Sequence, residues 1–140
     1  MNIKQNKGIG LLDAIFAVVI LMIFTGVIVS VSYNIYIQSH FIKRNEQATN
    51  YIVELFEHAQ GLLYEDVDST ELVQYINNKY DIAKAISGKY TEGTEILDGY
   101  TIFINVQDKY PDYIKQVDIT VAYKLGGKNR TVNMSTLINK

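Results

Sequence analysis

Two charged residues near the start of the chain, Lys7 and Asp13, stand out because of the apolar residues next to them. Lys7 is followed by Gly8 and then by a run of apolar residues, and Asp13 lies inside that run. A lone charge costs roughly 2.5–3.5 kcal/mol at the centre of a membrane-spanning helix and less near its end. Asp13 therefore needs either a cationic partner or a place at the interface, where an acid in the first turn complements the helix dipole.

The string from Lys7 to Ile15, Lys-Gly-Ile-Gly-Leu-Leu-Asp-Ala-Ile, resembles the cleavage and methylation signal of type IV prepilins and type II secretion pseudopilins. The resemblance implies that a prepilin peptidase cuts after Gly8 on the cytoplasmic side of the membrane. It also implies that Ile9 becomes the N-methylated N-terminus and that Asp13, the fifth mature residue, forms an ion pair during assembly.

The cut that the resemblance implies would supply the cation that Asp13 needs. It would leave an α-ammonium group on Ile9, one helical turn away from Asp13. At this axial offset the ammonium of one subunit can pair with the carboxylate of an adjacent subunit. Gly8 suits a cleavage site because a residue without a Cβ lets a protease approach the backbone closely.

The resemblance makes residues 1–8 a leader peptide, in which Lys4 and Lys7 are the basic residues. An Asp side chain is one methylene shorter than the Glu that is usual in this family, so pairing requires a closer approach. Two further departures from the family pattern accompany it, namely Ile9 in place of Phe and Gly10 in place of a small hydroxyl residue.

The segment 9–31 has the length of a membrane-spanning helix. Its 23 residues are apolar apart from two glycines and Asp13, Thr25 and Ser30. A helix of that length measures about 34 Å at 1.5 Å per residue, enough to cross a bilayer. The nearest bases lie before the segment or at least 12 residues beyond it. The short basic end should thus stay in the cytoplasm of a bacterium, which predicts a single-pass protein of the cytoplasmic membrane.

Residues 32–140 are expected to form an extracytoplasmic head that includes the outer, amphipathic half of the same helix. Apolar residues continue at helical spacing and Gly61 is a natural C-cap, so the sequence predicts one helix from about Ile9 to Gln60. The apolar positions after the span are Tyr33, Ile37, Phe41, Ala48, Ile52, Leu55, Ala59 and Leu62.

The stretch from Glu65 to Glu71 contains four acids in seven positions. Such a cluster is one way to bind calcium. Asp68, followed by Glu71 and two apolar residues, also has the pattern of an N-cap with its capping-box acid. We expect the capping role, with a short helix from about Ser69 to Lys79 and no metal.

Alternating apolar residues predict three strands in the C-terminal part of the chain, at about 100–106, 117–125 and 131–138. Gly126 and Gly127 favour a tight turn between the last two strands. The expected fold class is α+β, with the long N-terminal helix packed on a small antiparallel sheet of about three strands. This arrangement is similar to the pilin fold, and the stretch from Tyr123 to Leu137 resembles the final hairpin of minor pilins.

Composition and motifs argue against several other functions. The 13 basic and 15 acidic residues give a net charge of −2, which offers no general attraction to nucleic acid, and there is no cysteine. His40 and His58 are too far apart on the helix to share a metal, at about 27 Å. Phosphate-binding, dinucleotide-binding, nucleophile and zinc motifs do not occur in the sequence. We therefore expect no enzyme activity and no cofactor.

The leading hypothesis is a minor type IV pilin or pseudopilin that is inserted in the membrane, processed after Gly8 and assembled into a filament at the cell surface. Its expected partners are other pilin or pseudopilin subunits, the prepilin peptidase, the filament assembly machinery and the membrane. The alternative is an unprocessed binding or sensor domain held by a single membrane span. An N-terminus at Ile9 would favour the first hypothesis, and an N-terminus at Met1 the second.

Overall fold

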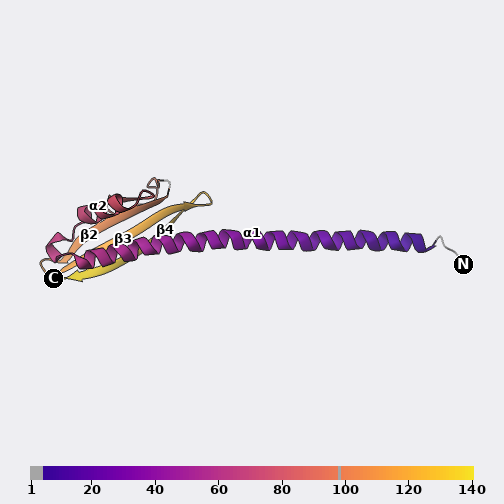
Figure 1. Ribbon diagram of the computed structural model, residues 1–140, viewed down its shortest axis with the longest axis horizontal. Coiled ribbons are helices and arrows are strands. Elements are labelled where there is room, and N and C mark those ends of the chain that lie inside the picture. Colours follow the sequence, from indigo (N-terminus) through magenta and orange to yellow (C-terminus); the bar gives the residue numbers. More distant parts are fainter. Residues whose placement is uncertain (1–4, 98) are drawn as a thin grey trace. The chain divides into compact units, whose positions relative to one another are not determined.

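The computed structural model describes residues 5–97 and 99–140, with side chains described from Gly10 onward. The chain divides into two compact units, Met1–Phe41 and Ile42–Lys140. The first described element, helix α1 (Gln5–Gly61), belongs to both units. The second unit, called the head below, also contains η1 (Tyr64–Asp66), α2 (Ser69–Lys79), β1 (Ala83–Ser87), β2 (Tyr100–Tyr110), β3 (Ile114–Leu125) and β4 (Lys128–Asn139) (Figure 1).

The prediction of an α+β fold with one long apolar N-terminal helix is confirmed. Helix α1 ends at Gly61, within one residue of the expected end, and it begins at Gln5, before the expected start at Ile9. It is the one helix among the described residues that is long and apolar enough to cross a membrane. Side chains are exposed throughout the stretch from Gly10 to Lys43, so this stretch has no packed core of its own.

The head contains one four-stranded mixed sheet with the order β1-β2-β3-β4. The strands β2, β3 and β4 pair antiparallel, as the alternating pattern predicted, but they are longer than expected. The fourth strand, β1, pairs parallel to β2 and was not predicted, because the short stretch Ala-Lys-Ala-Ile-Ser carries only a weak strand signal.

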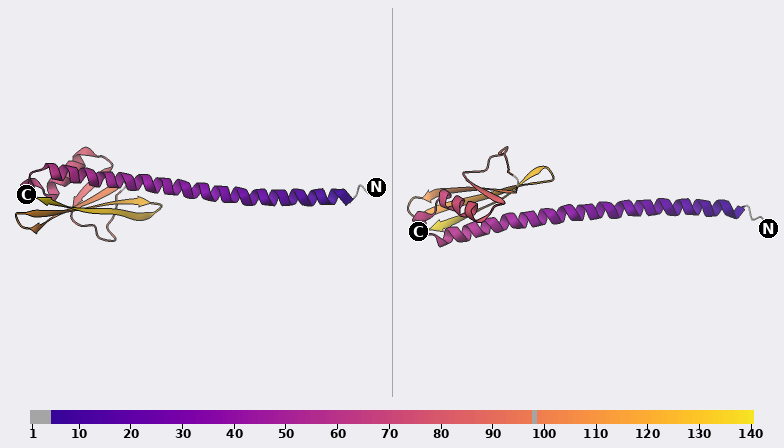
Figure 2. Two further views of the ribbon diagram at one scale, coloured as in Figure 1. Left: turned by 90° about the horizontal axis from the view of Figure 1, so that it is seen from below. Right: turned by 45° about the horizontal axis from the view of Figure 1, so that its top comes forward.

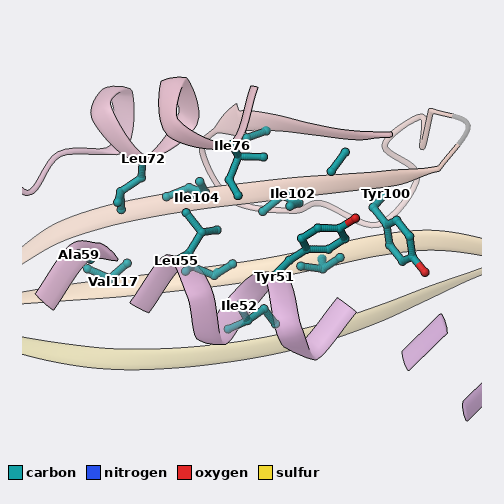
Figure 3. Packing of buried hydrophobic residues seen from close by; sticks show 14 of the residues in the cluster. Tyr51, Ile52, Leu55, Ala59, Leu72, Ile76, Tyr100, Ile102, Ile104 and Val117 are labelled. Atoms are coloured by element: carbon teal, nitrogen blue, oxygen red, sulfur yellow. The ribbon is translucent and has the colours of Figure 1, made fainter. Parts of the chain in front are cut away.

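The main core lies between one face of the sheet and the two helices of the head (Figure 3). Residues alternate along a strand, so Ile102 and Ile104 of β2 and Val117 of β3 point to the same face. The helices cover this face with residues at helical spacing. The core residues contributed by α1 and α2 are Ala48, Tyr51, Ile52, Leu55, Ala59, Leu72 and Ile76.

The packed part of α1 therefore starts at Ala48. Tyr33, Ile37 and Phe41 continue the same helical pattern toward the N-terminus, but they are exposed. Tyr51 joins the core although its pattern position did not predict it, and its ring contacts the rings of Tyr80 and Tyr100 at centroid distances of 5.0 and 5.3 Å.

The opposite face of the sheet is mostly polar, with a small apolar cluster under the loop that joins β1 to β2. Ile96 and Tyr90 of this loop pack on Phe103 and Ala122, which point away from the main core. Figure 2 shows the loop and the helices on opposite sides of the sheet. The loop ends at Gly99, which has a φ of +101°. A Cβ at this position would lie 2.3 Å from the Ile82 carbonyl oxygen, so only glycine fits there.

Helix α2 begins at the predicted position and has the predicted N-cap. The Asp68 carboxylate accepts hydrogen bonds from the backbone N–H groups of Ser69, at 2.7 Å, and Thr70, at 3.4 Å. The expected capping-box geometry differs in one respect, because the bonded N–H groups are those of the first two helical residues and not that of Glu71.

The two edges of the sheet differ. At the β1 edge the side-chain amide of Asn77 imitates a neighbouring strand: it donates to the carbonyl oxygen of Ala85 at 3.2 Å and accepts from the Ala85 N–H at 2.9 Å. The other edge is the full length of β4, whose residues are mostly exposed.

Candidate cleavage and assembly segment

The predicted cleavage residues lie at the start of α1. Lys4 falls outside the described residues, whereas Lys7, Gly8 and Ile9 belong to the helical backbone that begins at Gln5. The structure thus places the expected scissile bond and the expected new N-terminus on one continuous helix. Cleavage and methylation at this bond remain predictions.

Asp13 lies one helical turn beyond Ile9, and its side chain is exposed. Among the side chains described, from Gly10 to Leu97 and from Gly99 to Lys140, the ion pairs join Lys79 to Glu54 and Lys140 to Glu65. The carboxylate of Asp13 has no cationic partner in that part of the chain. A counter-charge for Asp13 within an apolar environment must therefore come from the segment before Gly10 or from another molecule.

The apolar helix that contains Asp13 exposes large side chains along its length. Leu11 is 68% exposed, Met22 68% and Phe24 64%. Exposure of large apolar side chains around a whole helix is unfavourable in water, so this stretch requires lipid or other helices around it.

One polar side chain within the apolar stretch satisfies its hydrogen bond locally. The Thr25 hydroxyl donates to the carbonyl oxygen of Leu21, one turn earlier, at 2.7 Å. The helix continues without interruption through Thr25 and the following Gly26. Thr25 thus leaves no unpaired side-chain donor in the apolar stretch.

A cluster of titratable groups in the head was not predicted from the sequence. The carboxylate of Glu54 on α1 accepts hydrogen bonds from the Tyr75 hydroxyl at 2.8 Å, from the Lys79 ammonium and from the Tyr80 hydroxyl. Lys79 also donates to the Tyr75 hydroxyl at 3.0 Å. These four residues are called the Glu54 clasp below.

The electrostatics of the Glu54 clasp agree with a structural role. Burial raises the pKa of Glu54, but the hydrogen bonds from Lys79, Tyr80 and Tyr75 outweigh burial and leave this pKa below its usual value. The hydrogen bond to Glu54 is the largest cause of the raised pKa values of Lys79 and Tyr80. The hydrogen bonds of the clasp join α1 to α2 and to Tyr80, the residue that follows α2.

Each histidine on α1 contacts an aromatic ring. His40 meets the ring of Tyr36 edge-on at a centroid distance of 4.4 Å, and His58 stacks on the ring of Tyr75 at 3.8 Å. Within the described part of the chain, no group of three or more His, Cys, Asp or Glu side chains is arranged to hold a metal ion.

The acidic stretch from Glu65 to Glu71 lines a shallow hollow of about 470 Å³ at one end of the head. Lys115 of β3 binds the neighbouring backbone, where its ammonium donates to the carbonyl oxygens of Tyr64 and Val67, each at 2.8 Å. No sequence signal identified Lys115, because the two carbonyls lie about 50 residues earlier in the chain.

Comparisons with protein-family models, with curated proteins and with solved structures find no match to this chain. The resemblance of the string from Lys7 to Ile15 to the prepilin signal therefore rests on the sequence motif alone.

Proposed function

We propose that this chain is a structural subunit of a filament, a minor type IV pilin or pseudopilin that is processed after Gly8. The observation that carries the proposal is the Asp13 carboxylate, which lies without a cationic partner among the described side chains in an exposed apolar helix, one turn after Ile9. The pilin-like fold, the cell-surface location and the partners named above belong to the same proposal.

Cleavage after Gly8 would give Asp13 its counter-charge. In the bilayer the charges of Asp13 and of the Ile9 ammonium are costly. In a filament the ammonium of one subunit and the carboxylate of the next form an ion pair, while apolar side chains of neighbouring helices replace the lipid. Removal of the leader therefore favours the assembled state over the membrane state.

The mass of the full-length protein purified from its source bacterium tests processing. A chain that begins at N-methylated Ile9 is the expected result. An intact chain that begins at Met1 would overturn the proposal and favour the unprocessed anchored binding or sensor domain.

The Asp13→Ala variant tests the ion pair separately. Membrane insertion and cleavage should be unchanged, because the substitution makes the helix more apolar. Incorporation into sheared filaments should fall by about tenfold or more, since an ammonium group would remain buried without its partner. Asp13→Glu is the matched control and should restore incorporation. Equal incorporation of the Asp13→Ala and wild-type chains would sink the pairing role.

A further inference from the structure

The charged residues of the head are sorted along the sequence. Between Arg44 and Lys79 there are seven acidic residues and no Lys or Arg. From Ile119 to Lys140 there are four basic residues and no Asp or Glu. The fold places four of these acids, Glu65, Asp66, Asp68 and Glu71, around one hollow, and Lys140 lies beside them. The other basic residues of the C-terminal region lie at the far end of strands β3 and β4.

The basic region includes the tip of the hairpin formed by β3 and β4. Gly126 and Gly127 turn the chain with φ values of 59° and 74°, which suits the tight turn of a two-residue hairpin loop. Lys124 and Lys128 are exposed on either side of this turn and are called the basic tip below. Arg44 of α1 adds a further cation at this end, 5.6 Å from the centroid of the Tyr100 ring.

The acidic region includes the hollow at the start of α2, called the acidic hollow below. Its four carboxylates belong to Glu65, Asp66, Asp68 and Glu71, and Leu62 and Gln74 also line it. Two cations lie near it. Lys140 is 3.9 Å from Glu65, and the ammonium of Lys115 is bonded to backbone carbonyls, so the four carboxylates outnumber these cations.

The basic tip and the acidic hollow lie at opposite ends of the sheet. Lys115, near the start of β3, bonds to the backbone beside the hollow, whereas Leu125 at the end of β3 adjoins the tip. Lys115 and Leu125 are ten positions apart, which corresponds to about 33 Å at 3.3 Å per strand residue. A single head cannot bring its own tip into its own hollow.

We propose that the basic tip of one copy docks into the acidic hollow of a second copy of this chain. The proposal rests on the proposed function and names a contact between neighbouring subunits. Two tips repel each other, as do two hollows, so charge selects the head-to-tail arrangement. A contact between different ends of identical subunits leaves one free end on each subunit, so further copies can add. Such a contact extends into a filament unless the rotation from one subunit to the next closes a ring.

Cysteine cross-linking of the full-length protein in detergent micelles tests this contact, because the natural chain contains no cysteine. Asn129→Cys lies at the tip and Gln74→Cys in the hollow, and neither substitution changes a charge. A chain with both substitutions should form a ladder of covalent oligomers with a short bis-maleimide. Asn133→Cys with Gln74→Cys is the matched control, since Asn133 is an exposed Asn on the same strand but away from the tip.

Charge reversal shows whether electrostatics hold the contact. In the double-cysteine chain, Lys124→Glu with Lys128→Glu should reduce cross-linking by about tenfold or more, and so should Glu65→Lys with Asp66→Lys. The chain that carries all four reversals should recover the ladder. Raising the salt concentration to about 0.5 M should weaken cross-linking of the unreversed chain, because salt screens exposed charges.

Three outcomes would overturn the docking proposal. The first is no ladder although both cysteines react with a maleimide dye. The second is a ladder that charge reversal leaves unchanged. The third is a cross-link from Asn129→Cys, formed in the source bacterium, to a different protein and never to Gln74→Cys of a second copy. The N-terminal mass is a separate readout, so a failure of docking and a failure of the proposed function are distinguished.

Discussion

The two stretches of helix α1 have the same backbone but opposite surroundings. From Gly10 to Lys43 the described side chains are exposed, including large apolar ones. From Ala48 to Ala59 one face of the helix is buried against the sheet and α2. The second stretch obtains its burial from the same chain, whereas the first requires lipid or other helices around it.

This difference teaches where each stretch gains its stability. The stretch from Gly10 to Lys43, called the inner stretch below, is a helix whose apolar side chains are exposed. The stretch from Ala48 to Ala59, called the outer stretch below, is amphipathic and stabilised by tertiary packing, as most helices of globular proteins are. The same type of substitution should thus have very different effects on the two stretches.

The largest expected effect comes from truncating a leucine in each stretch. Leu55→Ala removes a fully buried side chain and should lower the free energy of unfolding of the head by about 2–5 kcal/mol. Leu21→Ala removes a side chain that is 67% exposed and should change this free energy by less than about 0.5 kcal/mol. Urea unfolding in detergent micelles, followed by the near-ultraviolet signal of the tyrosines, measures both changes. Equal losses would break the comparison.

A smaller effect is expected from the Glu54 clasp. Glu54→Gln keeps the shape of the side chain but removes the charge that Lys79 and the two tyrosines bind, and it should cost about 1–2 kcal/mol near neutral pH. The head should remain folded, which separates this clasp from the core.

The effect of Glu54→Gln should depend on pH in a defined direction. The pKa of Glu54 is lowered by folding, so its contribution is present above the unfolded value of 4.5 and is lost as pH falls through the folded pKa. The stability gap between wild type and variant should narrow as the pH falls below about 4.5 and through the lower folded pKa of Glu54. Urea midpoints over this range measure the gap, and a gap that widens toward low pH would contradict the role given to the carboxylate.

The smallest effect is expected at the start of α2. Asp68→Ala removes the N-cap and should lower the stability of the head by about 1 kcal/mol, whereas Asp68→Asn should retain most of it. Neither variant should alter the helicity of the inner stretch of α1. Circular dichroism of the full chain in micelles measures this helicity. A shared loss of helicity would show that the two stretches do not behave independently.

Local patterns predicted much of the fold. The start of α2 was readable because Asp68 caps the first turn of the helix. Gly61 marked the end of α1 to within one residue, although it is the last helical residue and is not among the glycines with positive φ, so the expected C-cap geometry was wrong. Strands β2, β3 and β4 were readable because their apolar residues alternate. Strand β1 was missed, since its two buried residues are Ala83 and Ala85, whose small side chains give little contrast between faces.

Contacts between distant residues were not predictable from one sequence. Glu54 meets Lys79 across 25 positions, and Lys115 meets Tyr64 across 51. The candidate assembly segment is the opposite case, because the proposed roles of Gly8, Ile9 and Asp13 depend only on their spacing along one helix. The sequence indicated only that Asp13 needs a cation as its partner. It could not locate that cation, because we expect it to belong to another subunit.

The amide of Asn77 at the β1 edge has a consequence for unwanted aggregation. Exposed strand edges are templates on which partly folded chains add strands. Asn77 already binds both outward-facing backbone groups of Ala85, in the middle of a five-residue strand. Strand addition is thereby confined to β4, where Lys128, Arg130 and the adjoining Lys140 place like charges along the edge and oppose antiparallel pairing of two identical strands.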